Sequence, residues 1–125
     1  MRLASDTVVI LNSTLLGKPR DQDDAIRMLN ILNNKRHVVI TSYCILYKEF
    51  EITKSIKSVV FFNDNSPKLL SSYIESGKWL GKAGAYGIQD EDFDLVNHVD
   101  GSIYNVMGLP IEEIKKDLIR LGLIK

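Results

Sequence analysis

The pattern of apolar and polar positions changes its period several times along the chain, and each period predicts a different element. Residues 7–11 form an almost wholly apolar, β-branched run, which is typical of a strand buried on both faces. A turn signal follows, and residues 14–16 predict a second short strand. Residues 37–47 and 52–62 are rich in Val, Ile, Thr, Tyr and Phe, so they predict two long strands joined by a polar connection.

Three segments show the helical period, in which apolar residues return every three or four positions. Asp21 predicts the N-cap of a first helix. Ser66, with Pro67 directly after it, predicts the start of a second helix that ends before Gly77. A third helix is expected to follow Pro110.

The remaining segments complete the predicted order of elements. Residues 94–99 and 102–106 lie on either side of an Asp-Gly turn signal and are interpreted as a β-hairpin. Residues 78–92 contain glycines but no clear period, which predicts a loop or a broken strand. Strand, helix, long strands, helix, hairpin and helix together predict one α/β domain over residues 1–125 with a mixed sheet.

Composition narrows the class of partner. Sixteen Lys and Arg residues cancel sixteen Asp and Glu residues, so no global field attracts a nucleic acid polymer or a membrane, and a small phosphorylated ligand is favoured. The single cysteine, Cys44, excludes an internal disulfide. His37 and His98 match no metal-ligand spacing, so strand packing or a surface role is favoured for each. No apolar run reaches membrane-spanning length and the first residues lack a signal-peptide core, so the cytoplasm is the expected compartment.

Four polar segments border the predicted strands, and each has a functional and an ordinary interpretation. Asp6, beside a hydroxyl at the mouth of a strand, suits a general base or a metal ligand, although a turn or cap aspartate is commoner. Lys18 can aim its ammonium group into a cleft, although an exposed turn lysine is commoner. Residues 82–89 bring backbone N–H groups and the amide of Gln89, which suit a phosphate or a base edge as well as a surface loop. Residues 104–110 suit an anion at a helix start or ordinary packing.

Taken together and in order, these segments resemble the Maf family of nucleoside triphosphate pyrophosphatases. Residues 5–12 (SDTVVILN) resemble the family's (A/S)DT-V-V-x-L-(D/N) strand, and residues 16–21 (LGKPRD) resemble its LGKP-x-D segment. Residues 82–89 (KAGAYGIQ) match a family motif without a break, and residues 73–77 (YIESG) and 104–110 (YNVMGLP) resemble two more. The Asp-Thr pair and the Gly-Ile-Gln ending resemble the branch that acts on dTTP and UTP.

The resemblance implies a fold. It is a three-layer Maf/ITPase-like domain with a mixed, twisted central sheet flanked by helices. The chain is similar to the C-terminal part of that fold and is expected to be truncated at its N-terminus. The reason is that the family's first strand and its Ser-x-Ser-Pro-Arg-Arg phosphate loop have no counterpart before Asp6.

The resemblance also implies an activity, which is hydrolysis of dTTP or UTP to the nucleoside monophosphate and pyrophosphate. Asp6 would be the proton acceptor that activates water. Thr7 and Gln89 would help to select the base, and Lys18 and Lys82 would neutralise the triphosphate. A divalent cation, Mg²⁺ or Mn²⁺, would be held mostly through the phosphates, and a homodimer is expected.

Departures from the family pattern leave alternatives open. Asn63 stands where the family usually has an arginine, and the phosphate-gripping section has no counterpart, so hydrolysis by these residues alone is expected to be near background. One alternative is a non-catalytic nucleotide-binding or dimerisation remnant that needs another chain for its phosphate loop. The other is a plain α/β interaction module that binds no nucleotide.

Overall fold

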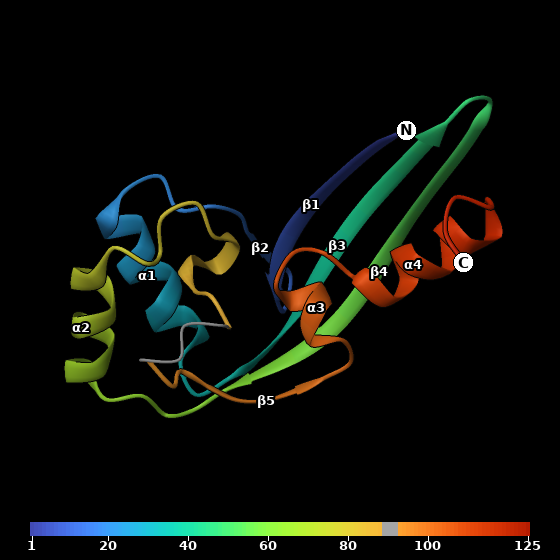
Figure 1. The fold of residues 1–125 in the computed structure, drawn as a ribbon. Helices are drawn as coiled ribbons and strands as arrows, with labels where there is room; N and C mark the ends of the chain where they lie inside the picture. Colours follow the sequence, from blue (N-terminus) through green and yellow to red (C-terminus); the bar gives the residue numbers. More distant parts are fainter. Residues whose placement is uncertain (89–92) are drawn as a thin grey trace.

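The computed structural model describes residues 1–88 and 93–125, and its central feature is a five-stranded sheet with the strand order β2-β1-β3-β4-β5 (Figure 1). The strands are β1 (Arg2–Leu11), β2 (Thr14–Leu16), β3 (Arg36–Tyr47), β4 (Phe50–Phe62) and β5 (Val96–Asp100). The helices are α1 (Gln22–Leu32), α2 (Pro67–Ser76), α3 (Ile103–Val106) and α4 (Ile111–Arg120), and a short 3-10 turn, η1 (Ala83–Ala85), precedes β5. The predicted α/β class is confirmed.

The strand pairs within the described residues are all antiparallel, whereas the sequence predicted a mixed sheet. β1 pairs with β3 from Arg2↔Leu46 to Ile10↔Val38. The first strand therefore begins at Arg2 rather than at residue 7, because pairing with the long β3 holds its polar N-terminal half in the sheet. An apolar run marks the buried part of a strand, while backbone pairing sets its length.

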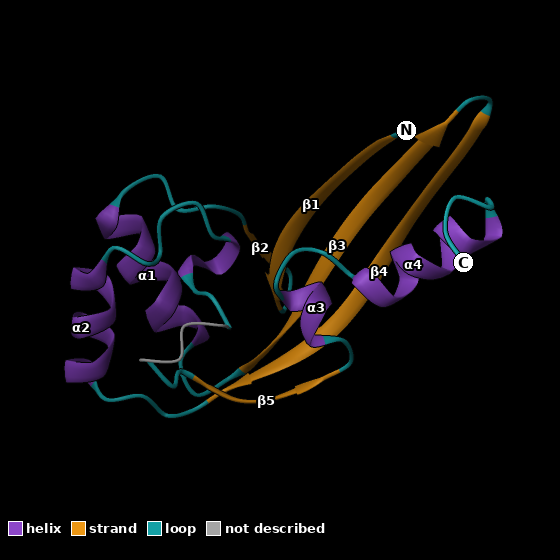
Figure 2. Cartoon of the chain, in the orientation of Figure 1, coloured by secondary structure: helices purple, strands orange, loops and turns teal. Residues whose placement is uncertain are grey.

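The helices cover one face of the sheet. Strand residues two apart share a face, so the odd-numbered side chains of β3 all point the same way. Val39 packs in the core cluster that includes α1 and α2, while Tyr43 and Ile45 pack with Ile114 of α4. Figure 2 shows α1 and α2 gathered at one end of the sheet, with α3 and α4 farther along it. The described residues thus form two layers, a sheet and a helical layer, where the resemblance implied three.

The opposite face of the sheet carries apolar side chains that belong to neither core cluster. Val9 and Leu11 are buried, but their neighbours Val8 and Ile10 are only partly buried, so β1 is not buried on both faces as predicted. The same partial burial extends across β3 and β4. The side chains of this face that we call the outer apolar face are Val8, Ile10, Val38, Ile40, Val59 and Phe61.

Two of the predicted helix starts are confirmed by their hydrogen bonds. The Asp21 side chain accepts a hydrogen bond from the Asp24 N–H at 2.8 Å, which caps α1. The Ser66 hydroxyl accepts one from the Leu69 N–H at 3.1 Å, which caps α2. Gly77 ends α2 in the left-handed conformation, φ 73°, as its position in the sequence predicted.

The predicted hairpin over residues 94–106 is wrong in its second half. β5 pairs with β4, but residues 103–106 form the helix α3. The Ser102 hydroxyl accepts a hydrogen bond from the Asn105 N–H at 3.2 Å. An Asp-Gly signal followed by a serine therefore ended a strand and opened a helix, because serine caps helices as readily as it occurs in turns.

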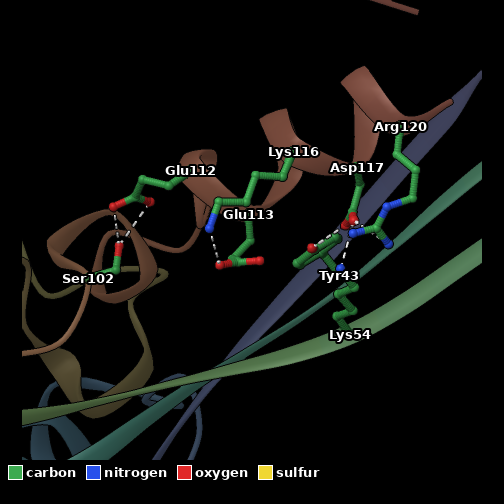
Figure 3. A network of polar contacts seen from close by, with 8 residues as sticks. All are labelled: Tyr43, Lys54, Ser102, Glu112, Glu113, Lys116, Asp117 and Arg120. Carbon is green, nitrogen blue, oxygen red and sulfur yellow. Dashed lines mark hydrogen bonds and ion pairs between the residues drawn. The ribbon is translucent and has the colours of Figure 1, made fainter. Parts of the chain in front are cut away.

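α4 is fastened to the sheet by a buried carboxylate. Asp117 is fully buried and accepts hydrogen bonds from the Tyr43 hydroxyl at 2.5 Å and the Lys54 ammonium group at 2.7 Å. The guanidinium of Arg120 lies 3.8 Å from the same carboxylate (Figure 3). Burial acts to raise the pKa of Asp117, but the hydrogen bonds from Lys54 and Tyr43 outweigh it, so the pKa lies below its usual value.

We expect Asp117→Asn to lower the free energy of unfolding by about 1–3 kcal/mol at neutral pH, because Tyr43 and Lys54 lose a charged acceptor. A carboxyl with a lowered folded-state pKa stabilises the fold above its unfolded pKa of about 3.9, and that contribution is lost as the pH falls through the lower folded value. Urea unfolding at pH 7 and near pH 3 measures both effects.

The matched control for this prediction is Glu113→Gln, on the same helix. Glu113 pairs with Lys116 at 3.4 Å in a more exposed setting, so its loss should change stability by less than about 0.5 kcal/mol. The prediction fails if Asp117→Asn lowers the free energy of unfolding as little as this control does. It also fails if the unmodified chain and Asp117→Asn lose equal stability between pH 7 and pH 3.

Candidate functional site

A cavity of about 230 Å³ lies between β1, the segment around η1 and the connection from α3 to α4. Five stretches of the chain form its walls, and they come from β1, the residues after β2, β3, the segment around η1 and the connection after α3. Polar side chains from β1, from the residues after β2 and from the segment around η1 line the cavity, together with the backbone of Gly81, Gly87 and Gly108. The residues that line it include Asp6, Thr7, Lys18, Lys82, Tyr86 and Gly108.

Asp6 lies in the part of β1 that pairs with β3 on one side only. β2 pairs with β1 at residues 9–11, so within the described residues no strand lies beside Asp6 on the other edge. The Asp6 carboxylate is exposed and accepts a hydrogen bond from the Thr7 N–H at 3.0 Å. The free strand edge therefore gives this carboxylate access to solvent and to the cavity.

Thr7 points to the helical side of the sheet. Its hydroxyl lies 2.9 Å from that of Thr41, its register partner on β3. Gly108, at the end of α3, closes over it with φ 98°, and a side chain there would start 3.5 Å from the Thr7 hydroxyl. Ser5 donates a hydrogen bond to the Gly108 carbonyl at 3.3 Å, so this glycine is tied to β1 directly.

The two lysines reach the cavity from two segments that are joined by a backbone hydrogen bond. Lys18 follows Gly17 after β2, and the Gly84 N–H donates a hydrogen bond to the Gly17 carbonyl at 3.1 Å. Gly84 has φ 70°, and a Cβ there would lie 3.0 Å from a methyl group of Val9. Only glycine lets this loop approach β1 so closely, and that approach keeps Lys18 and Lys82 on one cavity.

A buried pair behind the cavity escaped sequence reasoning. Tyr86 lines the cavity, and its hydroxyl lies 2.6 Å from Nε2 of His37, which is 2% exposed. Burial lowers the pKa of His37 to about 4, so the ring is neutral at pH 7. The sequence favoured strand packing or a surface role for His37, and the strand packing is observed. Its place in the inward-facing row of β3, next to Val39, was the signal for the contact.

The charged groups of this cavity suit an anionic ligand and a cation held largely by that ligand. Among the described residues, no group of three His, Cys, Asp or Glu side chains could hold a metal ion. Within that part of the chain Asp6 is the acidic side chain that lines the cavity, and the two lysines line it as well. A divalent cation that keeps most of its ligands from phosphates and water fits this donor set, since one carboxylate is enough to hold it in place.

The structure thus brings together the predicted site residues Asp6, Thr7, Lys18 and Lys82 around one space. The fifth, Gln89, lies outside the described residues. Their positions alone assign no role to any of them, so their roles stay predictions. No helix in the described residues is long and apolar enough to cross a membrane.

Comparison with known proteins adds two findings. The family model described as "Maf-like protein" matches residues 1–121. The chain is 45% identical to a "dTTP/UTP pyrophosphatase" of Pyrococcus furiosus over 120 residues, which are 96% of this chain and 63% of that protein. Over 122 residues it is 45% identical to a protein of the same name from Thermosipho africanus, covering 98% and 64% of the two chains. The chain therefore spans somewhat less than two thirds of the length of these relatives.

We expect the buried His37 to make the fold acid-sensitive between about pH 6.5 and 4. The unfolded chain takes up a proton on this histidine near pH 6.5, whereas the folded chain resists until about pH 4, so stability falls as the pH drops through this window. The loss should reach roughly 2–3 kcal/mol at pH 4. His37→Gln should abolish this decrease of the unfolding free energy with falling pH. His98→Gln, at an exposed ring, should leave the decrease unchanged. Urea unfolding from pH 7 to 4 measures the pH dependence of the unfolding free energy for the unmodified chain and the two variants. An unchanged pH dependence in His37→Gln would contradict the assignment of the acid sensitivity to His37.

Proposed function

The chain belongs to the Maf family, and we propose that it acts in the hydrolysis of dTTP and UTP to the nucleoside monophosphate and pyrophosphate. The observation that carries the proposal is the convergence of Asp6, Thr7, Lys18 and Lys82, from separate family motifs, on one cavity. The names of the relatives, dTTP/UTP pyrophosphatases, support the choice of substrate.

In the proposed reaction Asp6 accepts a proton from a water molecule at the edge of β1. The water oxygen bonds to phosphorus, the anhydride bond between the α- and β-phosphates breaks, and pyrophosphate leaves with the electron pair of that bond. The exposed position of the Asp6 carboxylate supports this role, because water must reach it. Such a transfer depends mainly on positioning and on neutralising charge.

Lys18 and Lys82 are the proposed partners of the triphosphate. Both line the cavity that Asp6 lines, and the hydrogen bond from Gly84 to Gly17 holds their segments together. Asp6 and the phosphates of the substrate would hold Mg²⁺ or Mn²⁺, which would supply further positive charge. Thr7 and Gln89 are proposed to select the base, and the cytoplasm stays the expected compartment.

We expect Asp6→Asn to lower pyrophosphate release from dTTP by about 10²–10⁴-fold, because an amide cannot accept the proton. The assay uses the chain alone and the chain joined to the part of the Pyrococcus furiosus relative that it does not match, since the chain covers 63% of that protein. The chain alone should stay near background and the joined protein should turn over. Asp64→Asn, at an exposed carboxylate that does not line the cavity, is the control and should retain activity.

Binding without hydrolysis would favour the alternative. A nucleotide that raises the melting temperature of both proteins, with no pyrophosphate released by either, indicates a non-catalytic nucleotide-binding remnant. No shift with any nucleotide indicates a plain interaction module. Turnover by the chain alone would overturn the expectation that a further phosphate-binding section is needed.

The proposed assembly is a homodimer formed through the outer apolar face. The support is that its side chains are partly buried, belong to neither core cluster and form one surface across β1, β3 and β4. Apolar surface of this kind is typical of interaction sites. A second copy would cover the same surface on both chains at once.

We expect Ile40→Lys to shift the chain from dimer to monomer, because a charge on the central strand of the outer apolar face must be desolvated on association. Sedimentation equilibrium of the two proteins measures the change. Lys57→Ile, at the exposed β4 position paired with Ile40, serves as the opposite variant and should strengthen association. A monomeric unmodified chain, or an Ile40→Lys dimer of equal affinity, would contradict the proposal.

A further inference from the structure

A row of three polar residues runs inward from the cavity wall. Thr7 lines the cavity, Thr41 lies behind it on β3 and Asn105 lies behind Thr41 on α3. The Thr7 and Thr41 hydroxyl oxygens are 2.9 Å apart, and the Thr41 oxygen is 2.9 Å from the backbone carbonyl oxygen of Asn105. Thr41 and Asn105 are both fully buried, so no bulk water competes for these bonds.

The number of protons in this row fixes the direction of each hydrogen bond. A hydroxyl carries one proton, and a carbonyl oxygen carries none. The Thr41 proton must therefore point at the Asn105 carbonyl, because two oxygens at 2.9 Å with no proton between them repel each other. Thr41 can then only accept from Thr7, so the Thr7 proton points away from the cavity. The Thr7 oxygen is left with lone pairs alone for a ligand.

Further contacts hold Asn105 in place, and they keep the hydrogen bonds from Thr7 to Thr41 and from Thr41 to Asn105 in this direction. Its side-chain N–H₂ donates to the Val39 carbonyl at 3.3 Å and to the Ser58 hydroxyl at 3.0 Å. Since Val39 offers a carbonyl, which only accepts, the amide orientation is determined. Ser58 in turn donates to the Ser102 carbonyl at 2.9 Å, and the Ser102 hydroxyl caps α3. The carbonyl that receives the Thr41 proton is thus anchored to β3, β4 and the start of α3.

We infer that Thr41 and Asn105 are positioning residues that lock Thr7 as a hydrogen-bond acceptor, which makes the cavity selective for a ligand with an N–H donor at that point. The inference rests on the proposed function for the identity of the ligand. Thymine and uracil carry a proton on ring nitrogen N3, whereas N3 of cytosine carries none and can only accept. An acceptor-only Thr7 facing N3 therefore binds thymine and uracil and disfavours cytosine, because two acceptors would be left facing each other.

The test compares binding of non-hydrolysable α,β-imido analogues of dTTP and dCTP to the 125-residue chain by calorimetry. The unmodified chain should prefer the dTTP analogue by about 10–100-fold, the range for one buried polar mismatch. Thr41→Val keeps the shape of the side chain but removes the hydroxyl, so Thr7 can turn its proton toward cytosine N3. The preference should fall at least tenfold, mainly through tighter binding of the dCTP analogue.

Thr41→Ser keeps the hydroxyl and is the matched control, so it should retain the preference. Melting curves of both variants check that each is folded. An unchanged preference in Thr41→Val overturns the inference, and so does a preference of the unmodified chain for the dCTP analogue. Equal weakening of both analogues would mean that Thr7 faces a sugar hydroxyl, which also overturns the assignment to N3.

A measurement without ligand separates this inference from the proposed function. If the lock exists, the Thr7 hydroxyl proton exchanges slowly, and the Thr7 Cβ signal splits in a mixture of H₂O and D₂O in carbon NMR. Thr41→Val should remove that splitting, and its absence from the unmodified chain overturns the lock. A splitting together with no binding of either analogue, by the chain alone or by the joined protein, leaves the lock standing and rejects the nucleotide as the ligand.

Discussion

The inward-facing row of β3 contacts each part of the helical layer. From one end to the other, its side chains meet the Tyr86 hydroxyl, the main core, the carbonyl of α3, the carboxylate of α4 and the second core cluster. These side chains are His37, Val39, Thr41, Tyr43 and Ile45. A register slip of one residue would turn the whole row to the other face and exchange all these contacts at once. The pairing of β3 with β1 and β4 on both sides, along nearly its whole length, is therefore the constraint on which the rest of the fold depends.

The row is unusual because its polar members are as deeply buried as its apolar ones. His37, Thr41 and Tyr43 are each at most 2% exposed. Burying such a group without a partner costs about 1–3 kcal/mol, so each polar side chain stabilises the fold only when its partner is in place. The three partners belong to three different segments of the helical layer. Hydrogen bonds of this kind fix which segment sits at which point of the sheet, a selection that apolar packing alone makes less sharply.

Much of the fold could be predicted from the sequence because its signals are local. The caps at Asp21 and Ser66 and the stop at Gly77 depend on side chains within a few residues, and all three were confirmed. The start of β1 at Arg2 and the single covered face depend on partners far along the chain, and both were missed. The prediction of a strand after Ser102 was wrong for another reason. A serine after a Gly turn suits a strand or a helix cap equally well, and the packing of α3 decides between them.

The candidate site was predictable to the same extent and for the same reason. Motif resemblance selected residues from separate segments, and the fold brings Asp6, Thr7, Lys18 and Lys82 together at one cavity. Thr41 and Asn105 escaped because neither reaches the cavity and their importance lies in the direction of a proton. That direction follows because the Thr41 hydroxyl lies between the Asn105 carbonyl and the Thr7 hydroxyl. Only the packing of α3 on the sheet creates this arrangement. A site can thus owe its chemistry to a residue that no ligand touches, because a hydroxyl alone can donate or accept and its buried neighbours decide which.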